Sequence, residues 1–195
     1  MNLGVIGYGS IAQHLVSALS GTDMQVTHVL ARQGREDAAT AVFGPTAKIV
    51  TTAADMPTTL DLIVECAGHV GLKSHGPALL RQGHELVTIS AGALADPALE
   101  TSLTDAARAG KTQLHIASGA IGALDALSCA ATGTLQTVHY TGRKPATGWQ
   151  GSHAETVLNL DTLTKPTPHF NGTARAAATL YPKNANVAAA VALAG

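Results

Sequence analysis

The 195-residue sequence has few aromatic residues and no cluster of like charges. Only 3% of the residues are Phe, Trp or Tyr, so a core has to be built from Ala, Val, Leu and Ile. Twelve basic residues balance thirteen acidic ones, for a net charge of -1, and no run of Lys or Arg occurs. Because a nucleic-acid or anionic-membrane surface needs such a basic patch, we expect neither partner.

Cysteine and long apolar runs are also scarce. Cys66 and Cys129 are the only cysteines and form no C-x-x-C pair, so we expect no disulfide scaffold or structural zinc site. His69 and His75 flank a glycine-rich turn without accompanying carboxylates, and we expect no metal there. The chain opens without a signal-peptide pattern, and its Ala-rich end is interrupted by Lys183 and asparagines. These features predict a cytoplasmic protein.

The first 117 residues alternate short apolar runs with helical patterns. Near-continuous apolar runs are typical of parallel strands buried on both faces, and their alternation with helices predicts right-handed crossovers in an α/β, doubly wound parallel sheet. The predicted strands are 2–6, 25–31, 60–66, 85–90 and 113–117, and the predicted helices are 11–19, 35–42, 72–81 and 97–109.

The stretch "VIGYGSIAQ" (5–13) fits the pattern G-x-G-x-x-A after the first predicted strand. Gly7 allows a tight strand-to-helix turn, Gly9 lets a pyrophosphate approach the backbone, and Ala12 lets helix and strand pack closely. The first amides of the helix, at Ser10 and Ile11, then face the phosphates. The stretch predicts a dinucleotide site, with a tight turn that binds no ligand as the alternative.

The end of the second predicted strand reads "VLARQGRED" (29–37). An NAD site usually offers a carboxylate to the ribose here, whereas Arg32 suits the 2′-phosphate of NADP. Glu36 or Asp37 also lies within reach of a ribose, and Arg32 and Arg35 as solvated loop charges are the alternative. We expect NADP, or use of both NAD and NADP.

The third predicted strand ends in "VECAGH" (64–69). The crevice at the carboxyl ends of such strands is where the nicotinamide half of the cofactor lies. Cys66 and Ala67 are small, so a flat ring can approach the backbone, and we predict that both contact the cofactor.

The composition changes after residue 117. "SGAIGALDAL" (118–127) places glycines and a serine before a helix, and residues 135–145 alternate like a strand of a second sheet. Arg143 and Lys144 end that strand. They are candidates to bind substrate carboxylates, with ordinary edge-strand charges as the alternative. We expect a dinucleotide-binding domain at 1–118 and a substrate domain at 119–195.

Six blocks together resemble the L-aspartate dehydrogenase family over nearly the whole chain: "GYGSIA" (7–12), "VECAG" (64–68), "SAGALAD" (90–96), "SGAIGALDAL" (118–127), "TGRKP" (141–145) and "YPKNANVAAAVALAG" (181–195). The resemblance implies a Rossmann domain followed by a smaller α+β substrate domain, with NAD or NADP as cofactor. It also implies oxidation of L-aspartate to iminoaspartate, which yields oxaloacetate and ammonia and feeds NAD biosynthesis, and a homodimer. Ala120 and Asn186 match the family's cofactor contacts, although an N-cap asparagine would look the same at 186.

The family's general base is a histidine that follows the apolar helix ending this sequence. The resemblance therefore implies that the catalytic residue lies beyond Gly195 and that the second domain is incomplete at its C-terminus. His139, His153 and His169 fall in the substrate half, but no neighbouring carboxylate supports any of them, and we assign no catalytic residue. The alternatives are an oxidoreductase like dihydrodipicolinate reductase or homoserine dehydrogenase, and an inert dinucleotide-binding module.

Overall fold

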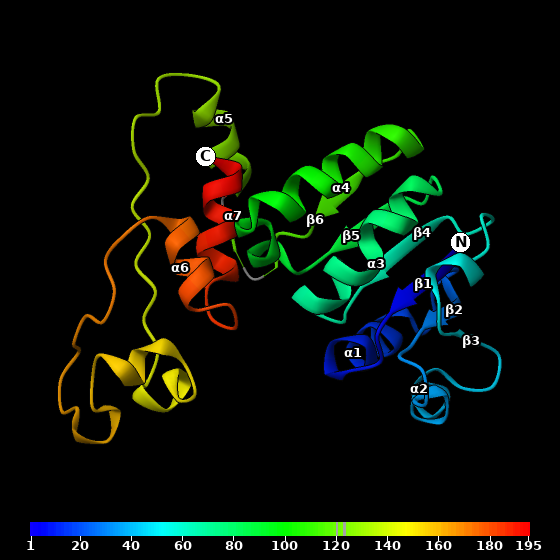
Figure 1. Ribbon diagram of the computed structural model, residues 1–195, viewed down its shortest axis with the longest axis horizontal. Helices are drawn as coiled ribbons and strands as arrows, with labels where there is room; N and C mark the ends of the chain where they lie inside the picture. Colours follow the sequence, from blue (N-terminus) through cyan, green and yellow to red (C-terminus); the bar gives the residue numbers. More distant parts are fainter. Residues whose placement is uncertain (120, 123) are drawn as a thin grey trace. The chain divides into compact units, whose positions relative to one another are not determined.

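A computed structural model describes residues 1–119, 121–122 and 124–195. The chain forms two compact units (Figure 1). The first unit comprises Met1–Ser90 and Pro97–Ala117, and the second comprises Ala91–Asp96 and Ser118–Gly195. A short segment that interrupts the first unit in sequence therefore belongs to the second.

The first unit is built on a six-stranded sheet in the order β3-β2-β1-β4-β5-β6, with every pair of neighbours parallel. This arrangement confirms the predicted doubly wound sheet. The central strands are mainly aliphatic and mostly buried, as expected for strands covered on both faces. The strands are β1 (Asn2–Ile6), β2 (Gln25–Leu30), β3 (Lys48–Val50), β4 (Leu62–Glu65), β5 (Leu86–Thr88) and β6 (Leu114–Ile116).

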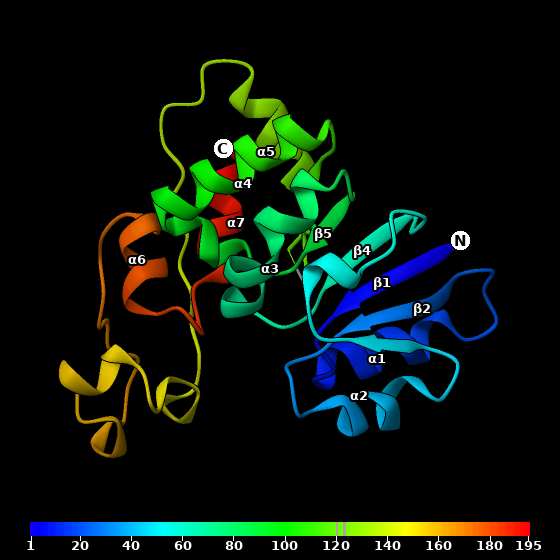
Figure 2. The same ribbon diagram turned by 45° about the vertical axis from the view of Figure 1, so that its right-hand side comes forward.

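Helices cover both faces of this sheet (Figure 2). α1 (Ser10–Leu19) and α2 (Glu36–Phe43) lie on one face, and α3 (His69–Arg81) and α4 (Pro97–Gly110) lie on the other. A single 3₁₀ turn, η1 (Ala53–Asp55), precedes β4. Because the strand order reverses between β1 and β4, the carboxyl ends of these two strands form the crevice in which such sheets bind ligands.

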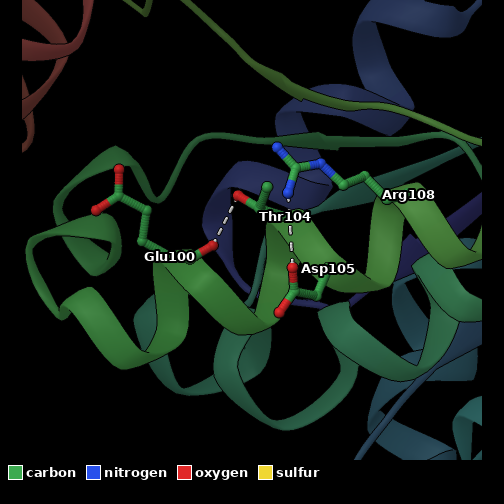
Figure 3. Close-up of polar contacts among 4 residues, drawn as sticks. All are labelled: Glu100, Thr104, Asp105 and Arg108. Carbon is green, nitrogen blue, oxygen red and sulfur yellow. Dashed lines mark hydrogen bonds and ion pairs between the residues drawn. The ribbon is translucent and has the colours of Figure 1, made fainter.

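Helix α4 shows why these segments become surface helices. Leu99, Leu103 and Ala106 are buried and recur at helical spacing, so one face of α4 packs on the unit. Between them, the Thr104 hydroxyl donates to the Glu100 carbonyl at 2.9 Å, and Arg108 lies 3.8 Å from Asp105 on the solvent side (Figure 3). An exposed pair of this kind contributes at most about 1 kcal/mol, so burial of the apolar face holds the helix in place.

The structure adds one strand that sequence reasoning missed. β3 is only three residues long and pairs with β2 at the edge of the sheet. Too few residues alternate or cluster there to give a strand signal. The other five strands lie within or equal the predicted runs, shortened by at most a few residues at their ends.

The second unit is helical. Its core is rich in alanine and closes around the buried Tyr181. The helices are α5 (Leu124–Ala131), α6 (Ala174–Leu180) and α7 (Asn186–Ala194), with 3₁₀ turns η2 (Ala91–Ala95), η3 (Ala146–Trp149), η4 (His153–Thr156) and η5 (Leu160–Thr162). None of the helices in the described ranges is long and apolar enough to cross a membrane.

The predicted strand over 135–145 is wrong. Residues 134–145 form no regular element and are exposed, including the large apolar side chains of Leu135, Val138 and Tyr140. A strand needs a neighbour for its backbone hydrogen bonds, and no strand lies among the described residues of the second unit. Alternation in the sequence therefore shows which side chains would share a face if the segment were a strand. It does not show whether a second strand is available for hydrogen bonding.

Candidate functional site

The turn between β1 and α1 requires glycine at its first position. Gly7 has φ +93°, in the region that side chains disfavour, and its N–H donates to the Leu30 carbonyl at 3.0 Å. A Cβ at Gly7 would lie 2.9 Å from the Cβ of Ala67. The close approach of the β1 and β4 turns therefore depends on the missing side chain.

The second glycine leaves open space instead. Gly9 precedes α1 with an ordinary φ of -73°, no side chain caps the helix, and a Cβ at Gly9 would meet nothing within 4 Å. The first hydrogen bond of α1 runs from the Gln13 N–H to the Gly9 carbonyl, so the amides of Ser10 and Ile11 precede the helical ladder. This open, uncapped helix start fits the pyrophosphate of a dinucleotide.

Ala12 lies in the first turn of α1 and is fully buried. It packs with Val5 of β1 and Cys66, at the end of β4. A larger side chain at this position would push α1 away from the sheet, and with it the amides at the start of the helix.

The loop after β2 carries both charges that bear on cofactor choice. Arg32 and Arg35 are exposed, and the Arg35 N–H donates to the Arg32 carbonyl at 3.1 Å in a turn. Glu36 and Asp37 occupy the first turn of α2 directly behind them. The segment after β2 therefore carries both kinds of group: the Arg32 guanidinium, which suits a 2′-phosphate, and the carboxylates of Glu36 and Asp37, which suit the ribose hydroxyls.

The turn after β4 presents a small, apolar surface. Cys66 is buried, and its N–H donates to the Ile6 carbonyl at 2.9 Å, whereas Ala67 is exposed. Burial, together with the charge of Glu65, raises the pKa of the Cys66 thiol to about 11. The thiol is thus protonated at neutral pH and a poor nucleophile.

Exposed aliphatic side chains add to this surface. Ile11 is 50% exposed and Val70 is 78% exposed, and each lies in the first turn of the helix that follows β1 or β4. Large apolar side chains on the ligand-binding edge of a sheet are typical of a surface that a ligand covers.

Sequence reasoning missed Glu65, the last residue of β4. Its side chain is fully buried, and its two oxygens accept hydrogen bonds from the Ala67 N–H, the Thr88 hydroxyl and the Ser90 hydroxyl, at 2.6, 2.7 and 2.8 Å. The signal was present in the sequence as a single acid within the apolar run 62–67. Burying a carboxylate costs folding free energy unless hydrogen bonds compensate for the lost water, so an acid in a buried strand indicates a specific set of partners.

In the second unit, Asn186 has a structural contact that the sequence did not indicate. It is the first residue of α7, and no side chain caps that helix, so the N-cap alternative is wrong. Its Oδ1 instead accepts the Gly92 N–H at 3.0 Å, while Arg175 donates to the Leu94 and Ala95 carbonyls of the same turn, η2. Cofactor contact by Asn186 stays a prediction, and Ala120 lies outside the described residues.

The two predicted substrate-binding cations differ in their surroundings. The Lys144 Nζ donates to the Asn184 Oδ1 at 2.6 Å and lies 5.2 Å from the centre of the Trp149 ring. Arg143 is exposed, and it makes no side-chain hydrogen bond or ion pair within the described ranges. These two contacts orient the Lys144 ammonium, and no such contact orients Arg143 among the described residues.

The histidines of the second unit provide no clear general base. His169 Nδ1 lies 3.0 Å from the Tyr181 hydroxyl, and its ring packs on Trp149 with centroids 4.3 Å apart. Burial, followed by the nearby His153, lowers the pKa of His169. His139 is exposed. None of these three pairs with a carboxylate of the described residues.

The described residues contain no group of three His, Cys, Asp or Glu side chains able to hold a metal ion. The second unit has an open hollow of about 510 Å³ lined by Gln150 and residues 155–161, none of which is a predicted site residue.

Two family models match the chain. The NAD-binding domain of homoserine dehydrogenase matches residues 7–117, and the C-terminal domain of aspartate dehydrogenase matches residues 125–195. The first match covers the glycine turn and the strands β2 to β6, and the second covers almost all of the helical unit that follows.

Relatives and a solved structure resemble the whole chain. An L-aspartate dehydrogenase of Ruegeria pomeroyi is 55% identical over 195 residues, which are 100% of this chain and 70% of the relative. One of Cupriavidus necator is 44% identical over 200 residues, covering 100% and 74%. The crystal structure of aspartate dehydrogenase from Thermotoga maritima superposes with a TM-score of 0.72 at 22% identity, covering 99% of this chain and 73% of that one, and supports the fold.

Proposed function

Because the chain belongs to the L-aspartate dehydrogenase family, we propose that it oxidises L-aspartate to iminoaspartate with NAD or NADP. The observation that carries this proposal is the open, uncapped start of α1 at Gly9 in a chain that matches such enzymes over its whole length. Hydrolysis of the imine then gives oxaloacetate and ammonia. When bound, the nicotinamide ring accepts a hydride from the substrate Cα.

The first unit supplies the cofactor site in this proposal. Backbone amides at Gly9, Ser10 and Ile11 hold the pyrophosphate, and the buried Ala12 keeps the start of α1 close to the sheet. Cys66 and Ala67 form the surface on which the ring lies. Because burial raises the pKa of the Cys66 thiol to about 11, the thiol stays protonated and does not attack the electrophilic ring.

The second unit supplies the substrate contacts, and we propose domain limits of 1–118 and 119–195. Arg143 and Lys144 bind the carboxylates of L-aspartate, since a guanidinium pairs with a carboxylate through two parallel hydrogen bonds. The Lys144–Asn184 hydrogen bond supports this proposal, because it orients the ammonium without neutralising it. Asn186 and Ala120 complete the cofactor contacts.

The wider setting is also a proposal. We place the enzyme in the cytoplasm as a homodimer that supplies iminoaspartate to NAD biosynthesis. The exposed Leu135, Val138 and Tyr140 on the segment 134–145 support an association surface. Light scattering on the purified protein tests the dimer, and a monomer at micromolar concentration would contradict it.

The direct test follows the absorbance of reduced nicotinamide after mixing the protein with L-aspartate and either NAD or NADP. D-aspartate, L-glutamate and L-homoserine are the control substrates. An increase with L-aspartate alone supports the proposal. If L-homoserine reduced NAD or NADP as fast as L-aspartate or faster, aspartate would not be the preferred substrate. If the protein bound the cofactor but oxidised none of these compounds, the proposed reaction would be rejected for this chain.

Cofactor preference has its own pair of variants. Arg32→Ala is expected to raise the KM for NADP at least about tenfold with little change for NAD, because a charge-assisted hydrogen bond to phosphate contributes about 1.5–3 kcal/mol. Arg35→Ala, three residues further along the same loop, is the matched control. An equal effect of both variants on both cofactors would show that Arg32 has no specific role.

A further inference from the structure

The carboxyl ends of β4 and β5 are joined through one buried side chain. Glu65 and Thr88 are paired residues of these two parallel strands. The Glu65 Oε2 accepts hydrogen bonds from the hydroxyls of Thr88 and Ser90, and its Oε1 accepts the Ala67 N–H. Glu65, Thr88 and Ser90 are each at most 2% exposed. One carboxylate thus holds three groups from two strand ends.

The direction of these hydrogen bonds fixes the arrangement. The Thr88 hydroxyl oxygen accepts the Ser90 N–H at 3.0 Å, so its own proton points to Glu65. The Ala67 amide is an obligatory donor and cannot reverse its role. An amide side chain at position 65 can keep its oxygen for the Ala67 N–H, but it then turns its NH₂ group to the Thr88 and Ser90 hydroxyls, which have to change from donors to acceptors. A carboxylate accepts from all three groups.

Ala67 is also the residue on which two glycines converge. A Cβ at Gly7 would lie 2.9 Å from the Ala67 Cβ, and a Cβ at Gly71 would lie 2.4 Å from it and 3.5 Å from the Glu65 Oε1. Ala67 is itself exposed at the carboxyl end of β4. Ala67 is therefore held by its hydrogen bond to Glu65 and by close packing against the backbone at Gly7 and Gly71.

We propose that Glu65 is a positioning residue for the nicotinamide half of the cofactor. Its hydrogen bonds hold Ala67, after β4, and Ser90, after β5, in fixed positions at the edge of the sheet where the nicotinamide binds. This inference rests on the proposed function and adds a role that none of the predicted contact residues has. Glu65 itself is fully buried and therefore offers no surface to a ligand. It acts through the backbone of 66–68 and through Ser90, where the chain leaves β5.

ADP-ribose provides the test, because it carries the adenosine, pyrophosphate and second ribose of NAD without the nicotinamide. The dissociation constants of the full chain for NADH and for ADP-ribose are measured by fluorescence titration and calorimetry. Glu65→Gln is the principal variant. Glu85→Gln is the matched control, because Glu85 directly precedes β5 but is exposed and bound to His115 at the sheet's other end.

We expect Glu65→Gln to weaken NADH binding about tenfold or more, since hydrogen bonds to a charged group are lost, and to change ADP-ribose binding less than about twofold. Glu85→Gln is expected to change neither. If Glu65→Gln weakened the binding of NADH and of ADP-ribose equally, Glu65 would only support the fold. If the binding of both ligands were unchanged, Glu65 would have no role in binding. Either result overturns the proposal.

Ser90→Ala keeps the test decisive if Glu65→Gln does not fold, because it removes one hydroxyl and leaves the carboxylate with two donors. It is expected to weaken NADH binding about threefold or more, relative to ADP-ribose. An unchanged ratio overturns the proposal. Binding by the wild type without turnover of L-aspartate rejects the proposed function alone, whereas a wild type that binds neither NADH nor NADPH rejects both.

Discussion

Alanine substitutions at Gly7 and Gly9 are expected to separate the stability of the first unit from its affinity for the cofactor. The two glycines lie in the same turn, yet their surroundings are opposite. Gly7 has φ +93° and lies against Ala67, whereas Gly9 has φ -73° and faces open space. Each position therefore tests one role of glycine while holding the other constant.

The expected magnitudes follow from these surroundings. For Gly7→Ala, the left-handed backbone costs about 1–2 kcal/mol, and forcing apart two Cβ atoms 2.9 Å from each other adds about 1–3 kcal/mol. For Gly9→Ala, the reduced entropy of the unfolded chain roughly offsets a poorer N-cap, so the unfolding free energy changes by less than about 1 kcal/mol. The new methyl group, however, occupies the space next to the α1 amides.

Urea unfolding of the protein without cofactor measures the first effect, and NADH titration measures the second. We expect Gly7→Ala to lower the unfolding free energy by about 2–5 kcal/mol. We expect Gly9→Ala to unfold like the wild type while its dissociation constant for NADH rises at least about tenfold, because the pyrophosphate can no longer approach the backbone. A Gly9→Ala protein that binds NADH normally would refute the assignment of this turn to the pyrophosphate.

Three further predictions concern single side chains. Iodoacetamide at pH 8 is expected to alkylate the exposed Cys129 and to spare Cys66. The Cys66 pKa of about 11 lowers its thiolate fraction about 100-fold relative to a thiol with the ordinary pKa of 9.0, and equal labelling of the two cysteines by mass spectrometry would contradict this. Burial lowers the pKa of His84 below 6.5, so below pH 6.5 the unfolded chain binds a proton at this residue more readily than the folded chain does. The unfolding free energy should therefore fall by up to about 1.4 kcal/mol for each pH unit below 6.5. His84→Gln should flatten that slope, and an unchanged slope would assign it to other histidines. Asn186→Ala should lower the stability of the cofactor-free protein by about 1 kcal/mol through loss of the Gly92 hydrogen bond, with recovery in Asn186→Asp; no loss would leave cofactor contact as its only role.

Local pattern was sufficient for the sheet. Runs such as 2–6 and 60–66 are apolar at all but one or two positions, which is typical of a strand covered on both faces, and the glycine spacing at Gly7 and Gly9 follows the first run directly. These signals depend on residues close together in the chain. The three-residue β3 was missed because its signal is too short, and it exists because β2 offers it an edge.

The sequence by itself determined the doubly wound sheet, the glycine turn and the family, because each is encoded in short runs of neighbouring residues. Tertiary structure decided whatever depends on partners distant in the chain. Residues 135–145 alternate like a strand, but the described part of the second unit offers no neighbouring strand for them to pair with. Asn186 has the sequence context of a helix cap, yet it bonds Gly92, 94 residues away. Glu65 stands in the sequence as a single acid in an apolar strand, and it gains a structural role only because folding brings Ala67, Thr88 and Ser90 to its two oxygens.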